Sequence, residues 1–507
     1  MEIADDLCDP CRAEGLIEST RGRFVVFGGC GMEEGGGILA RLLRREGHDT
    51  FAMRCVDLKH HWTSEQLQPV ATERAKLLLL AATLRARCYR GVPRQSVKRF
   101  TAFPKGAMSR RGFLRGALAP STEAIPYVAG ERCEPARCSR CLDACPMGAI
   151  AKREGQVWIE GARCTGCGVC TRACPREAIV HPTYRPEQIE AEVRGILSPL
   201  VRRFESRVIA FSCAAMGSPA GRLPESGHPV PPSVFEIPVP CLGFMSGHLV
   251  LKAFELGAAG VVLIPCQEPC RLGASLDPLL MEIRFAQQFL GRIGLGADRL
   301  AVLPPAVPHP AALAGALSGF VEAIRPLGVR RPSASEETGG EESALRKIRP
   351  VHSLARAFGA DHDMVMQHPG APCGAAEVQE SRCTLCGLCA AECPSGALSL
   401  SPASGSARLV FDYSRCECCE LCVRACPERA MVLRRVLDLA RLESASWEVL
   451  ATSPILACPR CGARHIPRAS LNAVRTRISR EGTEELFRSL ELCWRCRRKA
   501  LVGYRKQ

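Results

Sequence analysis

Short apolar runs separated by amphipathic stretches predict alternating strands and helices in two parts of this chain. Between residues 200 and 330 the runs RVIAF, VFEIPV, GVVLIP and DRLAVLP read as strands, with helical stretches between them. Residues 1–105 alternate in the same way. FVVFGG and HDTFAM predict strands, residues 35–45 predict a helix, and residues 64–87 predict a long helix with Ser64 as its N-cap. Both parts therefore read as α/β domains.

Cysteines dominate the remaining segments. The chain has 31 cysteines in 507 residues, eight of them within 131–182 and nine within 380–435. A polar, Gly/Ser/Glu-rich stretch at 332–346 reads as a linker. C-x-x-C groups in a long globular sequence favour metal binding in a reducing compartment over a disulfide framework. With no N-terminal signal peptide and only an internal twin-arginine-like stretch, SRRGFLRGAL, we expect a cytoplasmic protein.

The clearest motif occurs twice within residues 375–435. Both copies follow the spacing C-x2-C-x2-C-x3-C-P, in which three thiolates on one loop bind one cubane and the fourth crosses to the other. One [4Fe–4S] cluster is therefore predicted on Cys383, Cys386, Cys389 and Cys426, and another on Cys416, Cys419, Cys422 and Cys393. Cys418 breaks the spacing and reads as a spare thiol. Zinc binding is the alternative interpretation of these cysteines.

Residues 131–182 hold one perfect copy of this motif and one altered copy. Pro135 stands where the altered copy should have its first cysteine, and Cys133 is the expected substitute. The predicted ligand sets are Cys133, Cys138, Cys141 and Cys174 for one [4Fe–4S] cluster, and Cys164, Cys167, Cys170 and Cys145 for the other. A first site with only three ligands, or a [3Fe–4S] cluster, is the alternative. Both modules resemble bacterial two-cluster ferredoxins, which implies one-electron transfer.

Three cysteines in the middle region follow the ends of predicted strands, and a fourth comes one short turn later. Because parallel strands end at one edge of a sheet, we expect convergence there of Cys213, Cys241, Cys266 and Cys270. Such a site suits a [2Fe–2S] cluster or zinc, although cysteines are also common in ordinary cores. FSC, PC-x-G and GAAGVVLIPCQEPC resemble the delta subunit of methyl-viologen-reducing hydrogenase. The resemblance implies a [2Fe–2S] cluster that exchanges electrons with a hydrogenase, formate dehydrogenase or heterodisulfide reductase partner.

The N-terminal region resembles part of the A-type subunit of heterodisulfide reductase over residues 24–86. The matching stretches are VVFGGC, FAMRCVDLKHHW and ATERAKLLLLAA. That family binds an iron–sulfur cluster near these points, and Cys8, Cys11, Cys30 and Cys55 could supply four ligands here; a degenerate docking domain is the alternative. GGCGMEEGGG is not a G-x-G-x-x-G motif, so we expect no FAD.

Two further C-x2-C pairs lie in residues 450–507. Cys458 and Cys461 are separated by a helical stretch from Cys493 and Cys496. This spacing predicts a zinc ribbon-like site with four cysteine ligands. The site would be structural rather than redox-active, and another iron cluster is the alternative.

Together these patterns predict a multidomain α/β and α+β protein. Two two-cluster ferredoxin-like modules flank a Rossmann-like α/β [2Fe–2S] domain, followed by a small zinc ribbon-like element. The net charge of +15 suits acidic protein partners or anionic lipid, while an aromatic content of 5% argues against nucleic acid, and no segment is long and apolar enough to span a membrane. We expect an electron-transfer subunit between an oxidoreductase and a heterodisulfide reductase-like partner. A disulfide reductase and a redox-sensing scaffold are the alternatives.

Overall fold

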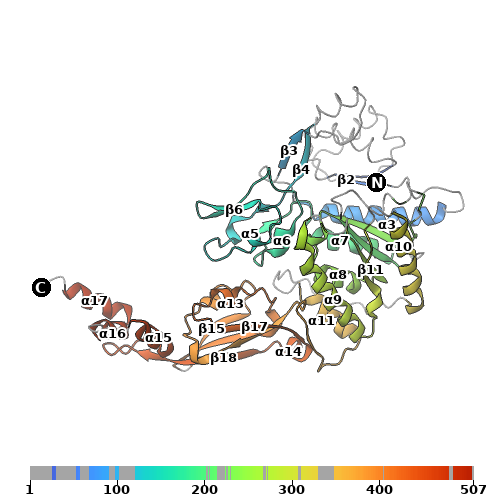
Figure 1. Cartoon of the computed structure of the whole chain (residues 1–507). Helices are drawn as coiled ribbons and strands as arrows, with labels where there is room; N and C mark the ends of the chain where they lie inside the picture. The colour runs from blue at the N-terminus through green and yellow to red at the C-terminus, as the bar shows by residue number, and fades with distance from the viewer. Residues whose placement is uncertain are drawn as a thin grey trace. The chain divides into compact units, whose positions relative to one another are not determined.

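A computed structural model gives the fold of the chain (Figure 1). It describes residues 25–29, 53–57, 68–90, 97–101, 120–200, 204, 206–213, 223, 227–228, 230–266, 270, 272–305, 310–328, 347–403, 405–478 and 484–504. Cys8, Cys11, Cys30, Ser64, the helix predicted at 35–45 and the linker at 332–346 lie outside these residues. The chain forms two compact units, one ending near residue 336 and the other comprising most of the residues that follow.

The N-terminal region contributes a parallel strand pair and a long helix. β1 (Val25–Gly29) pairs in parallel with β2 (Met53–Asp57). The strand predicted at residues 48–53 overlaps β2 at Met53, and residues 48–52 lie outside the described residues. Helix α3 (Gln68–Arg87) matches the predicted helix, and β3 (Val97–Thr101) and β4 (Pro120–Ala124) form an antiparallel pair that the sequence did not predict.

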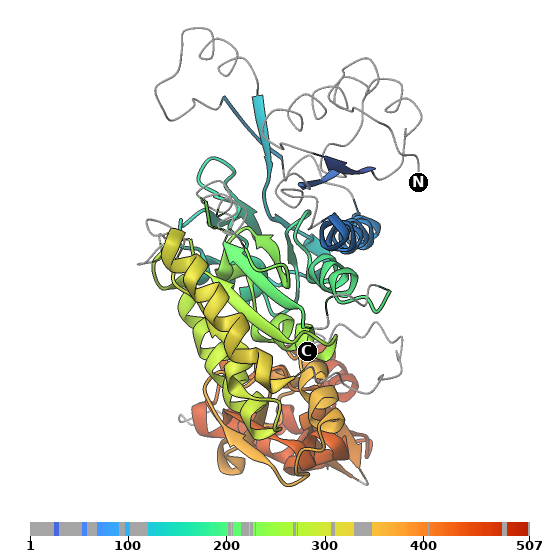
Figure 2. The same cartoon turned by 90° about the vertical axis from the view of Figure 1, so that its right-hand side faces the viewer.

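A four-stranded parallel sheet forms the middle of the first unit, in the order β10-β9-β11-β12. All four apolar runs predicted as strands are strands here: β9 (Val208–Cys213), β10 (Val234–Val239), β11 (Gly260–Ile264) and β12 (Leu300–Val302). The surrounding helices are α7 (Pro186–Ile196), α8 (Gly247–Glu255), α9 (Asp277–Arg292) and α10 (Pro310–Ile324). Figure 2 shows α10, in yellow, along the sheet, where Leu313, Leu317 and Phe320 join the core of the sheet.

Helix α3 packs closely against α7, as both views show (Figures 1 and 2). The backbones approach so closely that a Cβ atom on Gly195 would clash with Ala81 Cα. Arg85 forms a buried ion pair with Glu192, and the Arg74 guanidinium donates a hydrogen bond to the Val234 carbonyl at 2.6 Å. The N-terminal helix is thereby fixed to the middle domain.

Two small cysteine-rich modules repeat one arrangement of strand, helix, hairpin, helix and strand. Module I (residues 127–180) contains β5 (Tyr127–Val128), α5 (Arg140–Ala144), β6 (Ile150–Arg153), β7 (Gln156–Ile159), α6 (Val169–Ala173) and β8 (Ile179–Val180). Module II (residues 374–438) contains β14 (Gly374–Val378), α12 (Leu388–Ala391), β15 (Leu398–Ala403), β16 (Ser406–Asp412), α13 (Leu421–Ala425) and β17 (Met431–Asp438). The outer strands pair antiparallel in each module.

The second unit continues from module II into a C-terminal tail. The sheets of module II are extended by β13 (Val365–Gln367), β18 (Trp447–Ala457) and β19 (Arg464–Pro467). The helices outside the module are α11 (Arg349–Ala357), in which the division between the units falls, α14 (Leu439–Ser444), α15 (Arg468–Ile478), α16 (Glu484–Glu491) and α17 (Trp494–Tyr504). Among the described helices, none has the length and apolar composition needed to cross a bilayer.

Candidate metal centres

Left-handed backbone conformations shape the cysteine loops. In three loops, the second and fourth residues after the first cysteine have positive φ: Gly166 and Gly168, Leu385 and Gly387, Cys418 and Glu420. In all four copies, the third residue after the Cys-Pro cysteine also has positive φ: Gly148, Glu177, Gly396 and Arg429. These turns fold the loop around a common centre, so that the motif cysteines face inward.

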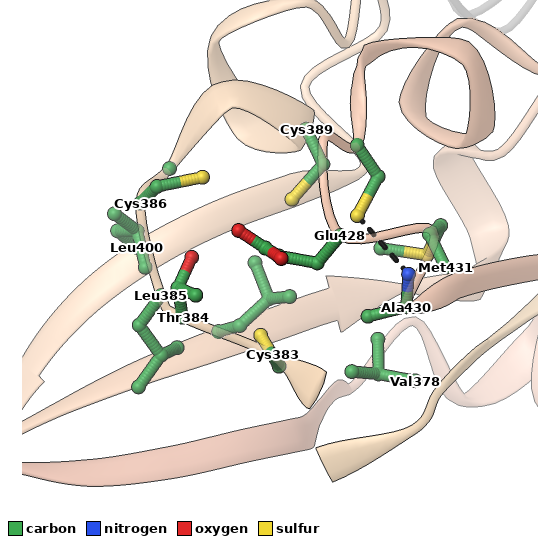
Figure 3. Close-up of a pocket in the computed structure, with 13 residues that line it drawn as sticks. Val378, Cys383, Thr384, Leu385, Cys386, Cys389, Leu400, Glu428, Ala430 and Met431 are labelled. Atoms are coloured by element: carbon green, nitrogen blue, oxygen red, sulfur yellow. Dashed lines mark hydrogen bonds between the residues drawn. The ribbon is translucent and has the colours of Figure 1, made fainter. Parts of the chain in front are cut away.

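The first cysteine group of module II lines one pocket (Figure 3). Cys383, Cys386 and Cys389 come from one loop, and Cys426 comes from the other end of the module. Apolar side chains including Leu400 and Met431 complete the wall, and Cys386 is exposed to solvent. The Ala430 backbone N–H donates to Cys426 Sγ at 3.3 Å, shown by the dashed line. The fourth cysteine of the motif therefore lies with the first three cysteines of the other copy.

The second group of module II lies beside the first. Burial and, after it, the neighbouring thiolates of Cys419 and Cys393 raise the pKa of the Cys422 thiol to about 12. The charge of Cys389, from the first group, also raises the pKa of Cys422. The two groups are thus adjacent, with Cys393 crossing to the second one.

Cys418 has a backbone role that explains why it breaks the motif. It occupies the left-handed loop position that is Gly166 in module I, with φ +52°. Its side chain is buried and turns toward β14, where a Cβ on Gly374 would lie 2.7 Å from Cys418 Sγ. This orientation suits the predicted spare thiol.

In module I, Cys145 crosses to the second loop. Cys145, Cys164, Cys167 and Cys170 line one pocket, with Met147 and Ile159 in its wall. Backbone N–H groups donate to these sulfurs: Ala149 N to Cys145 Sγ at 3.3 Å and Gly166 N to Cys164 Sγ at 3.4 Å. Such donors stabilise a thiolate and help to set the reduction potential of a bound cluster.

Cys133 takes the place of the first motif cysteine, where the chain has Pro135. It directly follows a 3₁₀ turn (Gly130–Arg132), just as Cys383 follows the 3₁₀ turn Glu380–Arg382 in module II. The pKa of Cys141 is raised to about 12 by burial, then by the thiolates of Cys174, Cys138 and Cys133. The structure therefore brings Cys133 into the group predicted for it.

All four groups fit a cubane. Each places sulfur donors from two separated loops around shared space, which suits a cluster in which each iron takes one thiolate. Burial keeps several of these thiols protonated, so metal binding would release their protons.

The middle domain brings Cys213 and Cys241 together at the carboxyl edge of its sheet. Cys213 ends β9, in register with Val239 of β10, and Cys241 follows two residues later. A hydrogen bond with the Cys213 thiol raises the pKa of Cys241, and burial raises it further. Gly243 N donates to Cys241 Sγ at 3.4 Å. Cys266 is buried after β11 at the same edge, and Cys270 is half-buried.

Module I docks directly on this edge of the sheet. Cys167 is near enough to Cys241 to raise its pKa. A Cβ on Gly168 would lie 2.9 Å from Phe244, and a Cβ on Gly243 would lie 2.9 Å from Val169. Arg172 of α6 forms an ion pair with Glu282 of α9 at 2.6 Å. The second cysteine group of module I therefore adjoins the Cys213–Cys241 pair.

The tail brings together its four predicted ligands. The Sγ atoms of Cys458, Cys461, Cys493 and Cys496 all lie within 4.8 Å of one another, and Cys461 and Cys493 are 3.6 Å apart. Tetrahedral zinc with Zn–S bonds of about 2.3 Å requires sulfurs about 3.8 Å apart. Hydrogen bonding from the Cys493 backbone lowers the pKa of Cys458 to about 6, which favours its thiolate. The donor set therefore fits a single zinc ion better than a cluster.

Sequence reasoning missed a buried polar network in module II. The Tyr413 hydroxyl lies 3.4 Å from Cys373 Sγ and accepts a hydrogen bond from Asp438 N at 2.9 Å. Burial raises the pKa of Cys373 to about 12, so this thiol stays protonated. Cys373 stands outside any C-x-x-C spacing, and no sequence signal could have paired it with Tyr413. Cys55, a candidate ligand of the N-terminal region, lies in β2 opposite Phe27 of β1.

Known families match three of these regions. Residues 208–328 match the methyl-viologen-reducing hydrogenase delta subunit, and residues 132–179 and 382–430 each match the 4Fe–4S dicluster domain. The family comparisons thus cover the middle domain and both modules.

Individual proteins with related segments are ferredoxin-like. "Ferredoxin 7Fe" of Hydrogenibacillus schlegelii is 32% identical over 70 residues, 14% of this chain and 90% of the relative. "Uncharacterized ferredoxin-like protein YdhY" of Escherichia coli (strain K12) is 38% identical over 53 residues, 10% of this chain and 25% of the relative. "Hydrogenase-4 component A" of the same strain is 33% identical over 78 residues, 15% of this chain and 37% of the relative. The chain thus spans well under half of the last two proteins.

These matches agree with the cysteine groups, since the two dicluster regions contain the paired motifs. The protein is an iron–sulfur electron-transfer protein related to hydrogenase components. The chain belongs to the ferredoxin-type iron–sulfur proteins, and it joins two 4Fe–4S dicluster modules to a hydrogenase delta-subunit domain.

Proposed function

We propose that this chain relays electrons between an oxidoreductase of the hydrogenase or formate dehydrogenase type and a heterodisulfide reductase-like partner. One observation carries the proposal: Cys167 of module I adjoins Cys241 of the middle domain. Electron transfer between cofactors needs short separations, and two cysteine groups that meet in this way could hold cofactors close enough for it. The delta-subunit match and the likeness to a hydrogenase component support the choice of partners.

The cofactors proposed are four [4Fe–4S] clusters in the two modules, one [2Fe–2S] cluster in a Rossmann-like middle domain, and one zinc ion in a ribbon-like tail. Bound clusters would supply one-electron redox chemistry at the cysteine groups. The chain supplies the cysteine ligands, donates backbone N–H groups to their sulfurs and packs Gly168 against Phe244 at the junction. No FAD is proposed, and the proposed compartment is the cytoplasm.

The test compares wild type with Cys213→Ser in anaerobically purified protein. Iron, sulfide and zinc are measured first, and EPR spectra are then recorded during stepwise reduction. Wild type should contain about 18 iron and one zinc per chain. Cys213→Ser should lose the [2Fe–2S] signal and about two iron, while Cys88→Ser, a half-buried cysteine of the first unit outside every predicted group, should lose neither.

The relay itself is tested with a reduced hydrogenase or formate dehydrogenase as electron donor. Wild type should be reduced, and Cys213→Ser should be reduced at least about tenfold more slowly, with its remaining clusters still reducible by a small molecule. About 16 iron in wild type, without a [2Fe–2S] signal, would make the middle domain a metal-free docking module. Equal rates in both proteins would exclude the middle domain from the electron path.

A further inference from the structure

Positive charge is concentrated at the C-terminal end of the chain. Residues 458–507 contain 13 Arg and Lys against four Glu, a net charge of +9 out of the +15 of the whole chain. A zinc ion with four thiolates carries a charge of 2−, so the loaded tail would still be strongly positive. A surface of this kind attracts negatively charged partners over roughly a Debye length, about 8 Å at physiological salt.

Some of these cations have structural roles. Arg475 pairs with Glu491 and Arg477 pairs with Glu428. Arg497 donates to the carbonyls of Ser489 and Leu490 and so caps the end of α16. Arg475 and Arg497 thus brace the tail, and Arg477 joins it to module II.

Three of the other cations lie on one face of α17. Arg495, Arg498 and Lys499 are exposed, and the last two stand three and four residues after the first, on the same side of the helix. Trp494 is 67% exposed, and the Arg495 guanidinium lies 5.4 Å from its ring centroid. The exposed Arg460 stands on the other cysteine knuckle, which the Cys461–Cys493 contact holds next to α17. The result is a cationic surface around an apolar indole, here called the α17 face.

The tail carrying this face contacts the exposed cysteine group of module II. Ser470 of α15 donates a hydrogen bond to the carbonyl of Thr384, which lies between Cys383 and Cys386. Glu428, the partner of Arg477, lines the same pocket as those cysteines (Figure 3). Cys386 is the one exposed cysteine of the two described modules. The tail therefore adjoins the cysteine group that is most open to solvent.

We propose that the α17 face is the docking surface for a small acidic electron-carrier protein that exchanges electrons with the Cys383–Cys386–Cys389–Cys426 group. The inference rests on the proposed electron-transfer function and adds the partner's chemistry and its place of docking. Cationic side chains steer the acidic carrier, and Trp494 supplies an apolar anchor of the type enriched at interfaces. These four cysteines would hold a cluster that supplies the one-electron acceptor for the electron lost by the reduced carrier; no bond forms or breaks.

The structure favours a protein over nucleic acid as the occupant. Proteins that bind single strands offer several stacking aromatics along a groove. The α17 face has one exposed indole among its described residues, and the tail that carries it contacts the loop of the exposed Cys386 through α15, which favours a redox protein over a polynucleotide.

The experiment measures binding by calorimetry and electron transfer separately, with a strongly acidic two-cluster ferredoxin as the probe. The test variant is Arg495→Glu/Arg498→Glu/Lys499→Glu. The control variant, Lys152→Glu/Arg153→Glu/Arg408→Glu, makes the same change in net charge at exposed positions of the two modules. Metal content is measured in both, and a milder Arg495→Gln/Arg498→Gln/Lys499→Gln variant is used if the first loses zinc.

Affinity should fall at least about tenfold in the test variant at low salt and at most about twofold in the control. The wild-type affinity should also weaken as salt rises. Reduction by the ferredoxin should slow in parallel, while reduction by a small molecule should not. Equal affinities in test and control variants would overturn the docking proposal, as would preferential binding of duplex DNA or anionic vesicles with no ferredoxin binding. Intact ferredoxin binding without electron transfer would instead refute the proposed function.

Discussion

At the scale of single residues, backbone conformation decides which cysteines face a metal. Cys418 and Cys419 are neighbours in the sequence, but Cys418 has φ +52° and its Sγ lies against Gly374 of β14, whereas Cys419 stands at the motif position. The same left-handed position is Gly166 in module I and Leu385 in the other loop of module II. We therefore expect that Cys418 shapes the loop and does not bind iron.

Adjacent substitutions should therefore have opposite effects on iron content. Cys419→Ala should lose about four iron per chain, because a cubane with three thiolates is unstable. Cys418→Ala should keep all of its iron. Iron analysis of both purified variants checks this, and equal iron loss would show that Cys418 is a ligand.

A buried histidine near a cysteine loop makes module I sensitive to acid. Burial lowers the pKa of His181 to about 4, aided by the charge of Arg85, while a hydrogen bond to the Gly166 backbone opposes the shift. The unfolded chain takes up the proton near the ordinary histidine pKa of about 6.5. Stability from neutral His181 is therefore present above about pH 6.5 and falls as pH drops toward 4, by up to about 3 kcal/mol.

His181→Asn should remove this part of the pH dependence. The midpoint of thermal unfolding should fall less between neutral pH and about pH 5 in His181→Asn than in wild type. The Thr183 hydroxyl, 3.3 Å from His181 Nδ1, is unchanged in both proteins. Parallel pH profiles would show that another group controls the acid response.

At the scale of elements, two glycines with the same φ distinguish the cost of backbone strain from the cost of a steric clash. Gly155 and Gly168 both have φ +75°, but a Cβ on Gly155 would meet no atom within 4 Å, whereas one on Gly168 would lie 2.9 Å from Phe244. An alanine at Gly155 therefore tests backbone strain alone, and an alanine at Gly168 tests strain together with the packing of α6 on the middle domain.

Gly168→Ala should consequently destabilise module I more than Gly155→Ala does. The left-handed conformation costs each variant about 1 kcal/mol, and Gly168→Ala adds about 1–3 kcal/mol for the clash. Thermal loss of the visible cluster absorbance in the two variants measures the difference. Equal midpoints would mean that α6 does not pack on Phe244.

The strands and the cysteine groups could be predicted from the sequence, but most contacts between elements could not. The strands at Val208–Cys213 and Gly260–Ile264 could be predicted because buried parallel strands are nearly continuous apolar runs. The crossed placement of Cys145 and Cys426 followed from the motif spacing. The contact of Gly168 with Phe244 and the pairing of Cys373 with Tyr413 could not be predicted, because they depend on packing between segments that share no local pattern.

At the scale of the whole molecule, metal sites in separate elements should be removable one at a time. The four tail cysteines come from α17 and the loops that follow β18 and precede α17, and their Sγ atoms gather around one point. A zinc chelator should remove about one zinc per chain and leave the iron content unchanged. Helical content should fall by no more than the tail contributes, as circular dichroism would show. Loss of iron together with zinc would contradict independent sites.

The packing of α3 against α7 also has a consequence for synthesis of the chain. The inner face of α3, including Leu77 and Ala81, is covered by a helix that begins 99 residues after Arg87. At about 5–20 residues per second, a ribosome needs about 5–20 s to make that interval. During this time α3 exists without its partner. Module I, whose cysteines emerge within the same interval, is thus built between two helices that can dock only after it is complete.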